Sequence, residues 1–255
     1  LNEDRFRFPL IQVKEFIMAN PHFQNLILNA GNTVATKHKK DVPMFHVNPS
    51  STLFYQYAND FMTYNSGDFT ITTTEAGTGS ATEALTSGAG GQLLLTNAAG
   101  DNDLDFLQLK GESFKLSSSK RAFFEARFKV SDATQSDVVM GLQITDTTPL
   151  AVSDGVYFMK DDGDTNLDFH IEKDGTDTTT AAVTTLADDT FVTVGFFIDP
   201  NTSQVSYFIG EAEPVGVVNT NLPDDEELTV SFGIQNGEAA AKTMTIDYVN
   251  VICER

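Results

Sequence analysis

The fold class is decided by the stretch Asn166-Leu167-Asp168-Phe169-His170-Ile171-Glu172. Its apolar side chains alternate strictly with polar ones, so the two sets fall on opposite faces of an extended strand. The stretch 123–130, Phe-Phe-Glu-Ala-Arg-Phe-Lys-Val, alternates in the same way. Strands with one apolar and one wet face are typical of antiparallel sheets and exclude a parallel α/β sheet.

The same kind of signal recurs along the chain, and turn signals such as Asp162-Gly163, Asp174-Gly175 and Asn236-Gly237 separate the segments. Further strands are expected at 92–97, 137–145, 156–160, 190–198, 204–209, 227–234 and 242–252. Residues 72–91 are small and polar, and they predict a long surface loop. Many short strands with almost no helix signal predict an all-β, antiparallel β-sandwich.

Charge divides the chain into two regions. The first 60 residues carry six basic and five acidic side chains, whereas the other 195 carry 10 and 31. This asymmetry places a boundary near residues 50–60. We therefore expect an N-terminal arm over residues 1–55, mostly extended, and a sandwich over residues 56–255.

The arm has little of its own to fold around. Short helices are expected at 10–19 and 23–29, each ended by Pro or Gly signals, and so few residues cannot build an independent core. The arm either packs on its own sandwich or docks on another subunit. Its apolar anchors for docking are Phe6, Phe8, Phe16 and Phe23.

Composition excludes several classes of partner. The formal net charge is -20, which repels nucleic acid and anionic lipid, and no 18-residue apolar run is present to span a membrane. The single cysteine, Cys253, cannot form an intrachain disulfide, which fits folding in a reducing cytoplasm. The sequence predicts neither a cofactor nor a nucleic-acid partner.

Catalytic motifs are missing, and the best remaining pair of carboxylates is too far apart. Asp168 and Glu172 share one strand face, but four strand residues span roughly 13 Å. Both glycosidase mechanisms need a shorter separation between their two carboxylates. A solvated strand face is the expected role, and no enzymatic activity is predicted.

Two acid-rich loops remain open between a Ca²⁺ site and a solvated turn. One holds Asp161, Asp162 and Asp164, and the other spans 101–105 with three aspartates. Neither follows the EF-hand spacing. Glycan binding by exposed aromatics is not favoured either, because the chain has no Trp and its six tyrosines are scattered along the sequence.

Four segments carry a resemblance to a known family: Asn59-Asp60-Phe61-Met62-Thr63-Tyr64, the strand 123–130, Val139-Met140-Gly141-Leu142-Gln143 and the segment 232–237. They resemble tailed-phage structural proteins with a concanavalin A-like jelly roll, over about residues 55–255. The resemblance implies a jelly roll like that of legume lectins and laminarinase-type glycosidases. Those glycosidases carry alternating acids on one strand, and here Asn166 stands at the nucleophile position.

Three functions follow from these observations. The first expectation is a non-enzymatic virion protein that decorates or cements the outer surface of a phage head, assembled in the host cytoplasm. Its partners would be the major capsid protein and further copies of itself on the shell. The alternative is a lectin-like module of a virion or tail fibre that binds a glycan. The third, an enzyme that cleaves polysaccharide, is disfavoured by Asn166.

Overall fold

The computed structural model describes residues 53–255, so everything expected of the arm before Leu53 lies outside the described residues. This applies to the two short helices and to the docking anchors Phe6, Phe8, Phe16 and Phe23. The described part is almost entirely β, and its one helix is the 3₁₀ turn η1 (Ser66–Asp68). None of its helices has the length and apolar character needed to cross a membrane.

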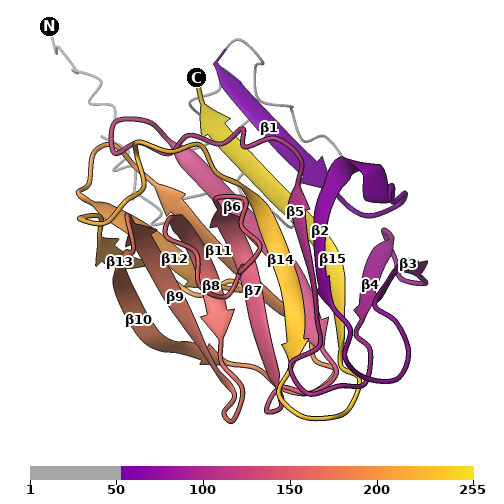
Figure 1. Cartoon of the computed structure of the whole chain (residues 1–255). Coiled ribbons are helices and arrows are strands. Elements are labelled where there is room, and N and C mark those ends of the chain that lie inside the picture. The colour runs from indigo at the N-terminus through magenta and orange to yellow at the C-terminus, as the bar shows by residue number, and fades with distance from the viewer. Residues whose placement is uncertain (1–52) are drawn as a thin grey trace, which may run out of the picture.

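One sheet, called sheet A here, has eight antiparallel strands (Figure 1). In spatial order, seven of them are β13 (Val215–Val218), β12 (Gln204–Ile209), β11 (Val192–Ile198), β6 (Ala122–Val130), β15 (Thr243–Glu254), β4 (Gln92–Thr96) and β3 (Thr82–Thr86). The eighth, β1 (Phe54–Asn59), pairs with the C-terminal half of β15, beyond the part of that strand that pairs with β4.

The other sheet, sheet B, has seven antiparallel strands. Their order is β10 (Thr176–Thr185), β9 (Asn166–Lys173), β8 (Gly155–Lys160), β7 (Ser136–Gln143), β14 (Thr229–Asn236), β5 (Leu104–Leu109) and β2 (Phe69–Thr74). Four strands in a row along the chain, β7 to β10, are neighbours in the sheet. Short turns join β8 to β9 and β9 to β10, whereas a longer loop joins β7 to β8.

The core lies between the two sheets and is rich in aromatic rings. Phe124 and Phe196 of sheet A stack with ring centroids 5.2 Å apart, and Phe169 of sheet B lies 5.9 Å from Phe196. These rings lie in the core because every second residue of a strand points inward. The inward faces therefore form one continuous apolar cluster across both sheets.

The predicted all-β antiparallel sandwich is confirmed, and the strongly alternating strands lie within about two residues of their predicted positions. The strand predicted at Asn166 to Glu172 runs to Lys173, and the one predicted at 123–130 begins at Ala122. The surface loop predicted at 72–91 is wrong in part. That region contains the end of β2 and the whole of β3, whose exposed edge position removes the need for apolar alternation.

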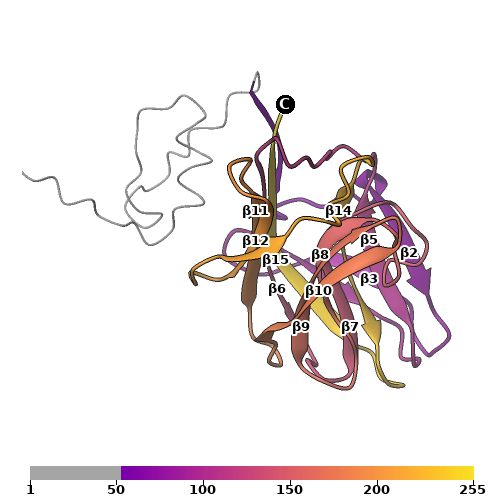
Figure 2. The same cartoon turned by 90° about the vertical axis from the view of Figure 1, so that its left-hand side faces the viewer.

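The two ends of the described chain meet at one end of the sandwich. Phe54 pairs with Glu254 and Asn59 with Val249, so β1 runs antiparallel to the last strand. Both views place β1 and the C-terminus together there (Figures 1 and 2). Whatever precedes Leu53 therefore joins the sandwich at this end.

Candidate functional site

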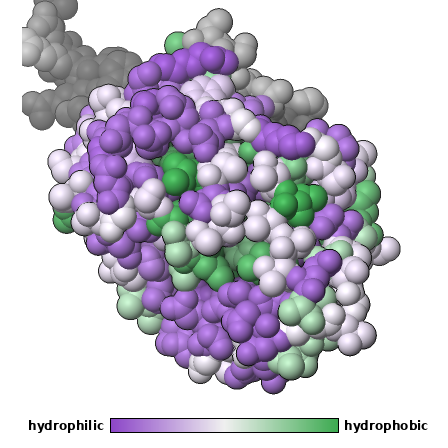
Figure 3. All heavy atoms as spheres, in the orientation of Figure 1, coloured by the Kyte–Doolittle hydropathy of each residue, from purple (hydrophilic) through white to green (hydrophobic). Residues whose placement is uncertain are grey.

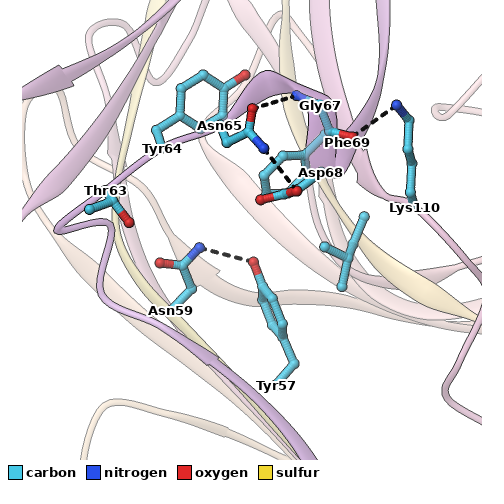
Figure 4. Close-up of a pocket in the computed structure, with 10 residues that line it drawn as sticks. Tyr57, Asn59, Thr63, Tyr64, Asn65, Gly67, Asp68, Phe69 and Lys110 are labelled. Carbon is cyan, nitrogen blue, oxygen red and sulfur yellow. Dashed lines mark hydrogen bonds between the residues drawn. The ribbon is translucent and has the colours of Figure 1, made fainter.

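A pocket of about 460 Å³ opens where the edges of the two sheets approach each other, between β1, η1 and the end of β5 (Figure 4). Its volume lies in the range of small-ligand sites. Polar and aromatic side chains supply most of its wall: Tyr57, Asn59, Thr63, Tyr64, Asn65, Asp68 and Lys110. Phe69 and Leu109 provide apolar wall surface.

A tight turn after β1 shapes one side of the pocket. The Asn59 Oδ1 accepts a hydrogen bond of 2.8 Å from the Phe61 N–H, and Phe61 adopts a left-handed conformation with φ of 48°. This turn buries the Phe61 ring completely, where it meets Phe232 edge-on at 6.1 Å. The chain is thereby redirected from sheet A towards sheet B.

The other side is a capped 3₁₀ turn. Asn65 is the N-cap of η1, and its Oδ1 accepts from the Gly67 N–H at 3.2 Å. The Asn65 Nδ2 donates to Asp68 at 3.0 Å, and Lys110 Nζ donates to the Gly67 carbonyl at 2.9 Å. The polar wall is therefore held in place by its own hydrogen bonds, as a preformed site requires.

Both tyrosines of the pocket are neutral hydrogen-bonding groups. Burial raises the pKa of Tyr57, whose hydroxyl accepts from Asn59 Nδ2 at 3.0 Å. Burial, and then the charge of Glu83, raise the pKa of Tyr64, which donates to Glu83 at 3.3 Å. The pocket thus combines two half-buried aromatic rings with amide, carboxylate and ammonium groups. This chemistry suits a neutral polyhydroxylated ligand.

Sequence reasoning missed this site because Tyr57 and Tyr64 lie on different elements and look scattered along the chain. The local signal was the sequence Asn65-Ser-Gly-Asp68, which is typical of a capped turn. Figure 4 shows Tyr57 and Asn59 facing the Tyr64–Asp68 wall across the opening.

The polar face of β9 lies where alternation predicted it, and its side chains are engaged by neighbouring strands. Glu172 accepts a hydrogen bond of 2.7 Å from the Tyr157 hydroxyl, and burial raises the pKa of Glu172. His170 pairs with Asp177 at 2.9 Å and stacks on the Tyr157 ring. Asp168 accepts from the Ala182 N–H at 2.7 Å. These contacts tie β8, β9 and β10 together.

The middle of the outer face of sheet B is covered by the loop of residues 144–154, which connects β7 to β8 and is called the strap here (Figure 1). Leu150 and Val152 of the strap pack against Phe106, Val139 and Tyr157 on the outer face. These contacts form a second, smaller apolar core, so much of the middle of this face is closed.

Buried polar side chains of sheet B hold the strap by its backbone. Gln108 Nε2 donates to the Ile144 carbonyl at 2.9 Å, and Gln143 Nε2 donates to the Pro149 carbonyl at 3.0 Å. Ser231 joins the two glutamines, donating to Gln143 at 2.7 Å. All three side chains are fully buried, so the strap is part of the folded structure.

The structure separates the acids of the first candidate Ca²⁺ loop. Asp161 and Asp164 line a small pocket of about 160 Å³ with Asp168, whereas the Asp162 side chain lies against Gly237. The Asp164 carboxylate accepts a hydrogen bond of 2.7 Å from the Asn166 N–H.

The aspartates of the second loop diverge as well. Asp101 is exposed, Asp103 accepts backbone hydrogen bonds and Asp105 is buried. Within residues 53–255, no three His, Cys, Asp or Glu side chains are placed to hold a metal ion.

No protein-family model matches the chain, and no curated protein matches it. Solved structures do. A protein of unknown function from Shewanella oneidensis MR-1 superposes with a TM-score of 0.55 at 15% identity, over 79% of this chain and 87% of that one.

Two further structures have named activities. Peanut lectin gives a TM-score of 0.51 at 11% identity, over 78% of this chain and 97% of the lectin. An endo-1,3-beta-glucanase from Streptomyces sioyaensis gives a TM-score of 0.53 at 13% identity, over 78% of this chain and 96% of the glucanase. The sandwich is therefore a concanavalin A-like jelly roll, as expected, an architecture that includes both lectins and glycosidases. Identities this low establish the fold alone.

Proposed function

We propose that this chain is a non-enzymatic structural protein that decorates the outer surface of a phage head. Its sandwich faces outward, and the residues before β1 dock on the major capsid protein. The observation that carries the proposal is the pairing of β1 with the last strand, which joins the near-neutral first part of the chain to one end of the sandwich. The molecule thus has one end for attachment and a separate body for display.

Charge supports the same orientation. The 195 residues after the first 60 hold 31 acidic and 10 basic side chains, and hydrophilic residues cover the upper and lower parts of the face seen in Figure 3. Docking surfaces favour apolar anchors with few uncompensated charges, so the acidic body is a poor docking surface. Facing outward, it keeps like-charged particles apart and lies away from packaged DNA.

The contacts of sheet B support a non-enzymatic role. Asn166 offers no carboxylate, Glu172 is hydrogen-bonded to Tyr157, and the strap covers neighbouring parts of the same face. A glycosidase needs two carboxylates that flank an accessible sugar bond. We expect the native chain not to hydrolyse β-glucans. Detectable hydrolysis by the native chain that either Asp168→Asn or Glu172→Gln abolishes would contradict this expectation.

The docking proposal is tested on emptied phage shells. We expect the triple change of Phe6, Phe8 and Phe16 to Ser to abolish binding, because attachment rests on apolar burial. The same three changes to Leu keep the apolar surface and should retain most of the binding. Binding of the native chain should persist in moderate salt, which screens ion pairs but not apolar contacts. Full occupancy by the Ser variant would refute docking through the arm.

A second candidate, a lectin-like glycan-binding role, is favoured by one observation: the pocket brings Tyr57 and Tyr64 together beside Asn59 and Asp68. Several structural neighbours are lectins or carbohydrate-active enzymes by name, such as peanut lectin and the endo-1,3-beta-glucanase. In this proposal a neutral saccharide stacks on the rings and bonds to the amide and carboxylate groups.

A glycan array separates this candidate from a purely structural role. We expect a neutral glycan bound by the native chain to lose at least about tenfold in affinity in Asp68→Ala and in Lys110→Ala, since a good hydrogen bond to a charged group contributes about 1.5 kcal/mol or more. Lys120→Ala, an exposed lysine outside the pocket, is the matched control and should bind normally. An array without any signal would refute the glycan-binding role and leave the structural proposal standing.

A further inference from the structure

Asp105 is a carboxyl group buried without a partner. It lies on β5, paired with Thr73 of β2 on one side and with Ile234 of β14 on the other. Its side chain points to the same side of the strand as Leu107, towards the interior between the sheets. The residue is fully buried, and within the described part of the chain neither carboxylate oxygen has a hydrogen-bond partner. Such a group is costly to keep charged.

Its neighbour Asp103 shows the opposite arrangement. Three backbone N–H groups donate to Asp103, from Ala76 at 2.5 Å, Gly77 at 2.9 Å and Gly100 at 2.7 Å. These bonds lower the pKa of Asp103 and anchor the loop that leads from β2 to β3. Two carboxyl groups that are two residues apart thus favour different protonation states.

The charges that act on Asp105 are both negative. Glu83 on β3 and Glu75 in the loop before β3 oppose its ionisation, and with burial as the largest cause they raise its pKa to about 7. Tyr64 also faces this region and donates its hydroxyl to Glu83. Among residues 53–255, no basic side chain contributes to the shift, so none of them compensates the charge of an ionised Asp105.

We propose that Asp105 is a proton-controlled latch: protonated, it lets β3 and the loop of residues 75–81 close over it, and ionised, it drives this edge open. The edge is suited to move by itself, because β3 has five residues and, among the described strands, pairs with β4 alone. Opening admits water to Asp105 and separates it from Glu75 and Glu83, which removes both causes of its unfavourable ionisation.

The pH window follows from the two states. A carboxyl group whose pKa is higher in the closed state binds more protons there, so acid stabilises the closed state. As the pH rises from the ordinary carboxyl value of 3.8 to about 7, the closed state loses this advantage; above about 7 the loss is complete. The opening equilibrium should therefore increase about tenfold per pH unit within this window and then level off.

Amide hydrogen exchange, corrected for the intrinsic pH dependence of exchange, measures this opening. In the native chain we expect the opening of β3 to increase about fiftyfold between pH 5 and pH 7. Asp105→Asn, a neutral side chain of the same shape, should remove the dependence and keep β3 protected at pH 7. Glu83→Gln removes one repelling charge and should move the levelling-off to lower pH. Asp101→Asn, which changes an exposed carboxyl group in the adjacent turn, should behave like the native chain.

Two results would overturn the latch. One is a pH dependence of β3 exchange that persists in Asp105→Asn. The other is an equal pH dependence in the central strands β6 and β15, which would place the effect in global unfolding. A ¹³C titration of the Asp105 carboxyl group gives an independent readout, and a midpoint near 4 would contradict the proposal.

Discussion

Lys160 shows how a single buried charge fixes a loop. Its side chain is 1% exposed, and its Nζ donates to the backbone carbonyls of Thr134, Ser136 and Asp161. Burial lowers the pKa of Lys160, but the three carbonyls satisfy its donors. The residue therefore connects the turn before β7 to the turn after β8.

We expect Lys160→Met to reduce the free energy of unfolding by about 2–3 kcal/mol, because hydrogen bonds to a charged group are lost and buried carbonyls lose a partner. Urea denaturation measures the change. Lys120→Met, at an exposed lysine, is the control and should stay within about 0.5 kcal/mol of the native chain. Equal stability of the two variants would show that the Lys160 contacts contribute nothing.

Gly90 and Gly91 form a matched pair in the turn before β4. Both have a positive φ, of 95° and 104°, that disfavours any side chain. A Cβ at Gly90 would meet open space, whereas one at Gly91 would lie 2.6 Å from the Phe61 carbonyl oxygen. The second glycine is therefore required for close approach as well as for backbone conformation.

We predict that Gly90→Ala costs the conformational strain alone, about 1–2 kcal/mol. Gly91→Ala should cost at least about 1 kcal/mol more, because the backbone of the turn at Phe61 must shift. Thermal melts of the two variants give the comparison. A Gly91→Ala variant as stable as Gly90→Ala would contradict the packing of this turn.

At the scale of elements, the alternating strands could be predicted and the edge strands could not. β9 and the part of β6 from Ala126 to Val130 bury one face, so their apolar residues reveal the period. β10 is an edge strand rich in threonine, and β3 is mostly exposed, so neither needs apolar alternation. The strap could not be predicted from the sequence either, because its contacts with Phe106 and Val139 join distant parts of the chain.

The first strand, β1, determines at which residue the folded sandwich begins. Phe54 is 2% exposed and packs with Phe123, Phe208 and Ile252, on the side of sheet A away from the main core. We expect a truncated chain of residues 53–255 to give a β-type far-UV spectrum and a cooperative melt. A chain of residues 60–255, which lacks β1, should be less stable by about 3–5 kcal/mol, as for loss of a buried Phe.

Phe54→Ala in the longer truncation separates packing from strand pairing, because it keeps the backbone pairing with β15. We expect it to account for most of the difference between the two truncated chains. Equal melting temperatures for residues 53–255 and 60–255 would contradict an integral role for β1.

At the scale of the whole molecule, the fold class and the acidic composition could be predicted from the sequence, and the sites could not. The all-β class and the acidic surface were evident from the sequence, because both depend on residue type and period. The pocket could not be predicted, because it depends on the meeting of β1, η1 and β5. The lack of a hydrogen-bond partner for Asp105 could not be predicted either. A single acidic residue in a strand is expected to face solvent until its neighbours in the fold are known.

The central claim is that the first part of the chain attaches and the sandwich displays. It is tested most directly by a density map of emptied phage shells incubated with the full chain or with residues 53–255. The account predicts ordered copies of the full chain on the shell, with β1 and the C-terminus nearest the surface, and no copies of the truncated chain. Equal occupancy by residues 53–255, or a sandwich seated on the shell by its acidic faces, would contradict it.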